Sequence, residues 1–200
     1  IIETEIVEKT KEIERLFEEQ VFAYFPTKVE NKGVVYKTTT GEPWGAYNYY
    51  QGDYTSINIF NIDRTFNRYR LITTACHEYE HHVASLFVEK YYRETNSLDL
   101  SAVLLLTKRC IVGEGTADCV KDFLGIKPEE YGELLEALSR LQDIVNLNVA
   151  YMLNVENIDE KTAVEYVASE GFVPIEEARK AIMFSLPSTP DGKPNLFKPY

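Results

Sequence analysis

All three histidines of this 200-residue chain stand in one hexapeptide, His77-Glu78-Tyr79-Glu80-His81-His82. Residues four positions apart on an α-helix differ by about 40° around the axis, so His77 and His81 can bind one ion from one helix face. Glu78 is rotated by about 100° from His77, which lets its carboxylate reach a water on that ion. On a helix, the pattern H-E-x-x-H is the signature of zinc hydrolases, in which the glutamate is the general base. The hexapeptide therefore predicts two metal ligands and one proton acceptor.

The sequence around the hexapeptide predicts one long helix over residues 64–93. Neither Gly nor Pro occurs between positions 64 and 98, and Asp63 is a suitable N-cap. Apolar residues recur at roughly helical spacing, namely Leu71, Ile72, Ala75, Val83, Phe87 and Tyr91. The motif would lie near the middle of this helix, where its side chains are held rigidly. His82 lies about 140° around the axis from His77, so we expect it to pack or hydrogen-bond rather than bind the metal.

A third ligand must come from outside the hexapeptide, because a catalytic zinc site usually has three protein ligands and a water. No histidine remains, so the ligand must be a carboxylate or a cysteine. Glu114 and Asp118 stand four residues apart in a largely apolar helical stretch, residues 103–124, where a buried carboxylate needs a partner or a metal. Ion pairing with Arg109 or Lys121 is the alternative for Glu114, and a solvent-facing position is the alternative for Asp118.

The pattern His77-Glu78-x-x-His81, followed by Glu114-x-x-x-Asp118, resembles the gluzincin metallopeptidases, both the thermolysin-like members and the larger helical carboxypeptidase-like members. The resemblance implies a zinc-dependent peptidase that acts on a peptide or protein substrate. It implies Zn²⁺ as the cofactor, with His77, His81 and Glu114 as its ligands. It also implies that Glu78 is the general base and that Asp118 hydrogen-bonds a ligand histidine, whose second N–H needs a partner.

Two features differ from the thermolysin pattern. The gap between the two motifs is 114 − 81 = 33 positions, which is longer than in thermolysin, and the resemblance covers only residues 45–120, roughly. In addition, the chain has no distal histidine to stabilise the oxyanion that forms during hydrolysis. A tyrosine or an arginine must then do so. Tyr151 is the first candidate for this catalytic residue, with Tyr166 and Tyr200 as alternatives, and packing in the core or at the surface is the other interpretation of each.

The order of elements predicts an α+β fold that is mostly helical. Strands are expected at residues 34–39, 46–50 and 54–60, where β-branched and aromatic residues stand between turns that contain glycine. Helices are expected at residues 2–24, 64–93, 98–124, 128–153, 160–169 and 174–185. The strands would form a small antiparallel sheet that precedes a zincin-like active-site helix, and a helical C-terminal part would follow.

We expect one zincin-like metallopeptidase domain over residues 1–200. Residues 1–63 would hold the N-terminal helix and the small sheet, residues 64–124 the metal-site helices, and residues 125–200 the helical C-terminal part. The gluzincin resemblance also implies an edge strand that binds extended peptide by β-addition. Residues 54–60 are the best candidate for that strand, and an ordinary internal strand is the alternative.

Charge and composition exclude several functions. The net charge of −11 and the pI of about 4.8 argue against nucleic-acid binding. No run of 18 apolar residues occurs, which argues against a transmembrane segment. Three cysteines without a C-x-x-C pair do not indicate a disulfide framework, and we expect Cys76, Cys110 and Cys119 to be small buried residues rather than ligands. This cysteine usage favours a cytoplasmic location.

Two other functions remain open. Glu78 and His81 also form an E-x-x-H pair, as in helical di-iron carboxylate proteins, but no histidine is left for the second such pair that these proteins need. The second alternative is an inactive or truncated peptidase-like zinc-binding domain that acts in binding, since a fold does not fix a function. Two irons per chain would identify the di-iron protein, and zinc without peptide turnover would identify the binding domain.

Overall fold

The computed structural model describes residues 2–24, 28–42, 44–64, 66, 68–100, 108–127, 131–183 and 185–188. These residues are mostly helical and include a three-stranded sheet, which confirms the expected α+β class. Contacts divide the chain into two compact units, Ile1–Lys127 and Pro128–Tyr200. The boundary lies close to residue 125, where the sequence predicts the start of the helical C-terminal part. The expectation of one domain stays a prediction, and the two units are described separately.

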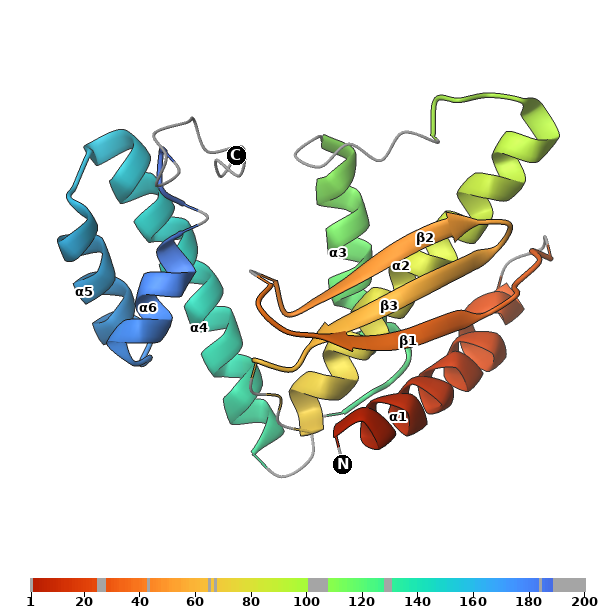
Figure 1. Ribbon diagram of the computed structural model, residues 1–200, viewed down its shortest axis with the longest axis horizontal. Coiled ribbons are helices and arrows are strands. Elements are labelled where there is room, and N and C mark those ends of the chain that lie inside the picture. Colours follow the sequence, from red (N-terminus) through yellow and green to blue (C-terminus); the bar gives the residue numbers. More distant parts are fainter. Residues whose placement is uncertain are drawn as a thin grey trace. The chain divides into compact units, whose positions relative to one another are not determined.

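In the first unit, one helix precedes the sheet and two longer helices follow it (Figure 1). Its elements are α1 (Ile2–Leu16), the π turn η1 (Phe17–Val21), the 3₁₀ turn η2 (Phe22–Tyr24), β1 (Val34–Thr39), β2 (Ala46–Gly52), β3 (Thr55–Asn61), α2 (Arg68–Thr95) and α3 (Lys108–Phe123). The expected strands agree with these to within two residues at each end. The helix expected over residues 2–24 is helical throughout, but its α-helical part ends at Leu16.

The sheet is mixed, with β3 in the middle and the strand order β1-β3-β2. β2 pairs antiparallel with β3, whereas β1 pairs parallel with β3, with Val35 opposite Ile57. The expectation of an antiparallel sheet is therefore wrong for β1. The reason is that β2 and β3 form a hairpin through a turn at residues 53–54, and β3 rather than β2 lies beside β1. Of the two alternatives for residues 54–60, the internal strand is the one observed.

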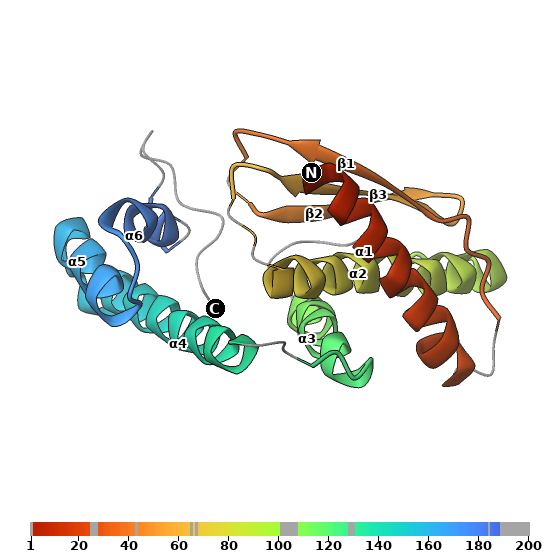
Figure 2. The same ribbon diagram turned by 90° about the horizontal axis from the view of Figure 1, so that it is seen from below.

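One face of the sheet packs on α2, and α1 lies beside α2 and β1 (Figures 1 and 2). Alternate residues of a strand face the same side, and Ser56, Asn58 and Phe60 of β3 are all buried. The core joins these elements with the end of α3, through Ile6, Ile13, Phe17, Phe60, Leu71, Ala75, Cys76, Tyr79, Val83, Val120 and Leu124. Burial of each large apolar side chain stabilises the fold by about 1.5–3 kcal/mol. This packing fixes α2 between the sheet and α3.

The start of α2 differs from the expected one. α2 begins at Arg68, and Asp63 is not its N-cap. The Asp63 carboxylate instead accepts a hydrogen bond from the backbone N–H of Gly41 at 2.6 Å. Asn61 reinforces this link by donating to the carbonyl of Glu42 at 2.8 Å. The carboxylate is therefore occupied in joining the turn after β3 to the β1–β2 connection, and the N-cap prediction is wrong.

His82 ties α2 to the sheet and to the segment before β1. The residue is fully buried, with Nδ1 2.8 Å from the Ser56 hydroxyl and Nε2 2.9 Å from the Asn31 side-chain oxygen. That oxygen can only accept, so Nε2 donates to it and Nδ1 accepts from Ser56. Asn31 in turn donates to the Tyr79 hydroxyl at 3.1 Å, and burial lowers the pKa of His82 to about 4. The expectation that His82 hydrogen-bonds in the core is confirmed.

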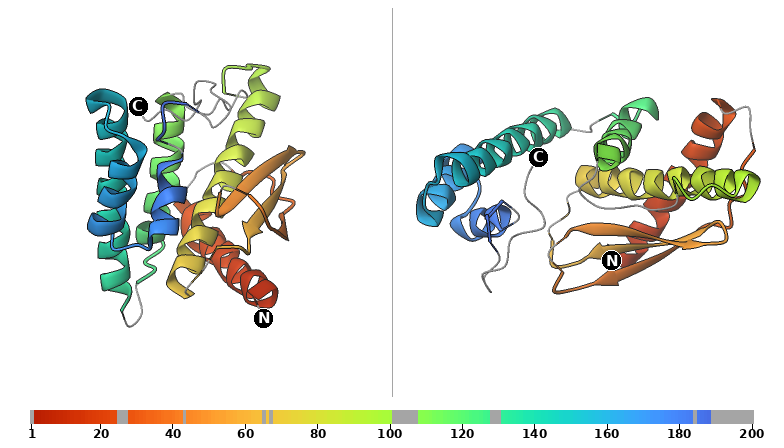
Figure 3. Two further views of the ribbon diagram at one scale, coloured as in Figure 1. Left: turned by 60° about the vertical axis from the view of Figure 1, so that its left-hand side comes forward. Right: turned by 90° about the horizontal axis from the view of Figure 1, so that it is seen from above.

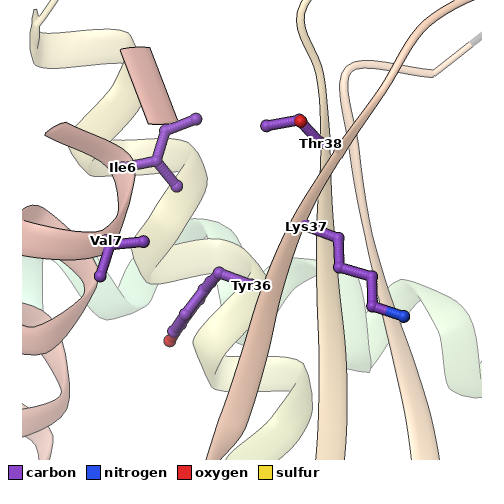
Figure 4. Close-up of a pocket in the computed structure, with 5 residues that line it drawn as sticks. All are labelled: Ile6, Val7, Tyr36, Lys37 and Thr38. Carbon is purple, nitrogen blue, oxygen red and sulfur yellow. The ribbon is translucent and has the colours of Figure 1, made fainter. Parts of the chain in front are cut away.

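A shallow pocket of about 270 Å³ lies between α1 and β1 (Figure 4). It is lined by Ile6, Val7, Tyr36, Lys37 and Thr38. Ile6 and Val7 come from the helix, and the Lys37 side chain extends away from that helix. The lining contains neither a histidine nor a carboxylate, so we assign no catalytic chemistry to it.

The described part of the second unit is helical (Figure 3). It contains α4 (Gly132–Tyr151), the π turn η3 (Met152–Glu156), α5 (Glu160–Glu170) and α6 (Ile175–Ile182), as the sequence predicts to within a few residues. Asp159 caps α5 by accepting from the backbone N–H of Thr162 at 2.9 Å. Its core comprises Val145, Val149, Leu153, Ala163, Val164, Val167, Ala178 and Ile182. The first three residues of the helix expected over residues 128–153 lie outside the described residues.

Spanning the hydrocarbon core of a bilayer takes about 20 predominantly apolar residues in one helix. Within the described ranges, no helix is both long and apolar enough to cross a membrane.

Candidate metal centre

His77, His81 and Glu114 come together where α2 packs against α3. Nε2 of His77 lies 3.1 Å from Nε2 of His81 and 3.2 Å from one carboxylate oxygen of Glu114. The other oxygen of Glu114 lies 3.7 Å from Nε2 of His81. Atoms that bind one zinc at about 2.0–2.1 Å and at tetrahedral angles are roughly 3.3 Å apart. The three side chains are therefore close enough together to hold one metal ion.

The position of Glu114 follows from the packing of α3. Ala117 and Val120 are buried, and residues three or four apart share a helix face, so Glu114 falls on the side that meets α2. The ion pairs considered for Glu114 are not observed among the described contacts: Lys121 lies over the Tyr69 ring, and Arg109 donates to a backbone carbonyl in the preceding segment. Glu114 contacts the two histidines instead.

Asp118 lies one turn after Glu114 and contacts the first histidine. Its carboxylate accepts a hydrogen bond from Nδ1 of His77 at 2.9 Å. Because a carboxylate only accepts, Nδ1 of His77 carries the proton of this hydrogen bond. The Asp118 side chain is also 75% exposed. It therefore faces solvent as well, as the alternative interpretation expects. The structure thus places Asp118 where it can orient one ring.

The charges of this cluster are strongly coupled. Burial alone would lower the pKa of His77, but hydrogen bonds to Asp118 and Glu114 raise it to about 10. Hydrogen bonds from His77 and His81 in turn hold the pKa of Glu114 well below its usual range. Such a site stabilises positive charge between carboxylates, which is also what a divalent cation requires.

Glu78 lies beside the cluster and is 6% exposed. Burial raises the pKa of Glu78, the charges of His77 and His81 lower it, and the backbone N–H of Asn48 donates a hydrogen bond to the carboxylate. Asn48 belongs to β2, so the sheet as well as the helix holds this side chain. A buried carboxylate with a raised pKa next to a metal site can accept a proton from water near neutral pH.

The tyrosines expected to stabilise an oxyanion lie in the part of the chain after residue 127. Tyr151 ends α4 in the second unit and is 57% exposed, so its catalytic role stays a prediction. Tyr166 also belongs to that unit, where its hydroxyl accepts from Asn148 at 3.0 Å, and Tyr200 lies outside the described residues. In the first unit, Tyr47 of β2 was missed. Its pKa is raised by burial, by Tyr49 and by the charges of Glu78 and Glu114. The sequence contains one signal for Tyr47: residues 46–50 are also an expected strand of the sheet that precedes the motif helix.

The three cysteines differ in how far they are exposed to solvent. Cys76 is fully buried as expected, Cys110 is half-buried, and Cys119 is exposed, so the expectation for Cys119 is wrong. The helical stretch that contains Cys119 is apolar on several faces, and only one of them packs on α2. The ligand group found in the described ranges contains no cysteine, and no second group suited to a di-iron centre is found there. The cytoplasmic location stays a prediction.

Comparison of the chain with protein-family models, with curated proteins and with solved structures gives no match. The resemblance to gluzincins therefore stays a prediction from the two sequence motifs.

Proposed function

We propose that this chain is a zinc-dependent peptidase in which Glu78 is the general base. The main support is the convergence of His77, His81 and Glu114 on one point beside a buried carboxylate. Two imidazoles and one carboxylate form a donor set used by zinc peptidases, and this set leaves a fourth position for water. A structural zinc site would be closed by a fourth protein ligand, and the ligand group of the described residues has three members.

When bound, Zn²⁺ would lower the pKa of a water molecule and polarise a peptide carbonyl. The residues of the chain would bind the ion, orient its ligands and transfer the proton. His77 and His81 would hold the ion through Nε2 and Glu114 through its carboxylate, while Asp118 keeps the proton on Nδ1 of His77. Glu78 takes a proton from the attacking water and returns it to the nitrogen of the leaving amine. One water is consumed and one peptide bond is cleaved.

The free edge of strand β2 favours a peptide or protein as the substrate. In the described sheet, β2 pairs with β3 on one side and with no strand on the other. An extended peptide can add to such an edge through main-chain hydrogen bonds. The same strand contributes Asn48, which contacts the proposed base. We therefore place the substrate along β2 and not along residues 54–60, whose strand is internal.

Metal analysis of the purified chain, combined with turnover of a broad peptide library, tests this proposal. We expect about one zinc per chain, as in mononuclear zinc hydrolases, and cleavage of peptide. Glu78→Gln should keep its zinc and lose turnover, because the substitution removes the proton acceptor and leaves the ligands. Glu94→Gln, at an exposed position near the end of the same helix, is the matched control and should behave as wild type.

Each negative result has a distinct meaning. Absence of bound zinc at neutral pH would refute the metal site. Normal turnover by Glu78→Gln would show that another group is the base. Zinc binding without turnover by the wild-type chain would favour the inactive binding domain over the peptidase.

A further inference from the structure

Glu80, the residue before His81 on α2, has a carboxylate that the fold leaves incompletely paired. Its side chain is 14% exposed. One oxygen, Oε2, is fully buried and has no hydrogen-bond partner among the described residues. A buried polar atom without a partner costs about 1–3 kcal/mol, and more when it carries charge. Such an oxygen needs a donor close by.

Two groups lie against this carboxylate. The hydroxyl of Thr116 on α3 donates to it, although the same hydroxyl lies 2.9 Å from the carbonyl of Gly113, so its single proton is shared. Oε2 lies 3.6 Å from Nδ1 of His81. That contact is longer than a hydrogen bond, and a side-chain shift of about 0.5 Å would bring it within the usual range. His81 is therefore the donor within reach of the unpaired oxygen.

The surroundings of His81 repeat those of His77. In both rings Nε2 faces Glu114, at 3.2 Å for His77 and 3.7 Å for His81. In both rings Nδ1 faces a carboxylate, which is Asp118 at 2.9 Å for His77 and Glu80 at 3.6 Å for His81. The two carboxylates come from different helices, and each lies on the side of its ring away from the ligand cluster.

We propose that Glu80 is a positioning residue of the metal centre, which accepts a hydrogen bond from Nδ1–H of His81 and directs Nε2 of that ring toward the ion. This inference rests on the proposed metal site. An imidazole that binds a metal through one nitrogen carries its proton on the other, and a carboxylate acceptor there fixes the ring and raises its basicity. Glu80 and Asp118 thus act alike on the two rings.

Zinc affinity, measured by competition with a chromogenic chelator, is the first readout. Glu80→Ala removes the acceptor and should weaken zinc binding by about 10–100-fold, the usual effect of losing such a partner. Glu80→Gln keeps an acceptor oxygen and the shape of the side chain, so it should recover most of the affinity. Glu94→Gln is the control and should leave the affinity unchanged. Recovery in Glu80→Gln separates hydrogen bonding from the loss of a bulky group.

Proton NMR of the Co²⁺-substituted chain is the second readout, because a bound cobalt ion shifts the exchangeable N–H signals of its imidazole ligands. A hydrogen bond to a carboxylate slows exchange of such a proton with water. Glu80→Ala should therefore speed the exchange of the His81 signal and spare that of His77, and Asp118→Ala should do the reverse. A merely structural role of Glu80 would not select one ring.

Unchanged zinc affinity together with an unchanged His81 signal in Glu80→Ala would overturn the role of Glu80 and leave the metal site standing. A wild-type chain that binds neither Zn²⁺ nor Co²⁺ would overturn the metal site, and the role of Glu80 with it. If Glu80→Ala fails to fold, as judged by circular dichroism, Glu80→Gln decides. Its neutral acceptor should give faster exchange of the His81 proton than in wild type, and an equal rate would overturn the proposal.

Discussion

Asn48, in the edge strand β2, donates its backbone N–H to the carboxylate of Glu78, near the middle of α2. The contact crosses from the sheet to the motif helix and gives the proposed base a fixed partner. It also limits how far burial raises the pKa of Glu78, since a hydrogen bond to the charged form stabilises that form. The sheet therefore belongs to the candidate site together with the two helices.

Glu114→Ala should weaken zinc binding more than the roughly 10–100-fold expected for the loss of an orienting partner, because it removes one of three ligands. Chelator competition on the purified chain measures the effect. Asp122→Ala, an exposed carboxylate on the same helix, is the matched control and should leave the affinity unchanged. Equal affinities of wild type and Glu114→Ala would place the third ligand elsewhere, with Asp118 as the first residue to test.

Tyr47→Phe should lower kcat by about 100–1,000-fold with zinc retained, the effect of removing one oxyanion donor. The physical reason is that Tyr47 precedes Asn48 in β2 and that the charges of Glu78 and Glu114 act on its hydroxyl and raise its pKa. Tyr49→Phe is the matched control, since Tyr49 lies in the same strand with its ring 4.5 Å from that of Tyr47 and is 41% exposed. Steady-state kinetics on a cleaved peptide give the comparison.

Tyr151→Phe tests the residue that the sequence predicts for the same role. We expect kcat within a few-fold of wild type if Tyr47 is the donor. A loss of kcat confined to Tyr151→Phe would assign the role to Tyr151 and exclude Tyr47. A wild-type kcat in both variants would show that neither hydroxyl stabilises the oxyanion.

Glu89→Gln should lower the free energy of unfolding by about 1–3 kcal/mol at pH 7, because Glu89 joins α2 to the β2–β3 hairpin. The carboxylate accepts from the Tyr50 hydroxyl, from the backbone N–H of Tyr54 at 3.1 Å and from Arg93 at 2.7 Å. Burial raises the pKa of Glu89, but these hydrogen bonds together lower it below the ordinary 4.5. Urea denaturation of variant and wild type at several pH values measures the difference.

The pH dependence has a defined sign. A lowered folded-state pKa means that the stabilisation from Glu89 is fully present above pH 4.5 and is lost as the pH falls through the folded-state value. The difference between wild type and Glu89→Gln should therefore shrink in acid. A difference that stays constant down to about pH 2 would show that packing, and not charge, is responsible. Glu94→Gln, which affects a surface ion pair with Lys90, should change stability by less than about 1 kcal/mol.

Cys119 should react with a thiol reagent in the folded chain, and Cys76 only after unfolding. Cys119 is exposed, whereas burial raises the pKa of the Cys76 thiol to about 12 and suppresses the reactive thiolate. A chromogenic disulfide reagent, applied to wild type and Cys119→Ser before and after denaturation, counts the reactive thiols. A fast-reacting thiol that persists unchanged in Cys119→Ser would point to Cys110 and contradict this prediction.

Features that depend on local spacing could be predicted from the sequence. The helical period around the hexapeptide predicted α2, and the four-residue spacing placed His77 and His81 on one face. The same spacing placed Glu114 and Asp118 together on α3, where both meet His77. The positions of the strands followed from their β-branched and aromatic residues between glycine-containing turns. Each of these depends on residues no more than a few turns apart.

Features that depend on pairing between distant segments could not be predicted. The parallel pairing of β1 with β3 is set by how the β2–β3 hairpin folds back, which no single strand encodes. The contact from Asn48 to Glu78 uses a backbone N–H, which every residue except proline has, so the residue type does not reveal it. Glu80 occupies one of the two unspecified positions of H-E-x-x-H, so the motif does not mark it, and its proposed role depends on its distance from His81 and on the contact with Thr116 of α3. The apolar character of α3 likewise did not show that Cys119 lies on its uncovered face.

The attachment of β2 to Glu78 also bears on where a substrate would be cut. A peptide added to the edge of β2 moves in steps of two residues, because a slip of one turns every side chain to the opposite face. Since Asn48 of that strand also contacts the proposed base, each permitted register of a bound peptide would bring a peptide bond to an equivalent place relative to Glu78. The point of cleavage would then depend on the backbone register of the substrate on β2 rather than on the identity of the side chains that flank it.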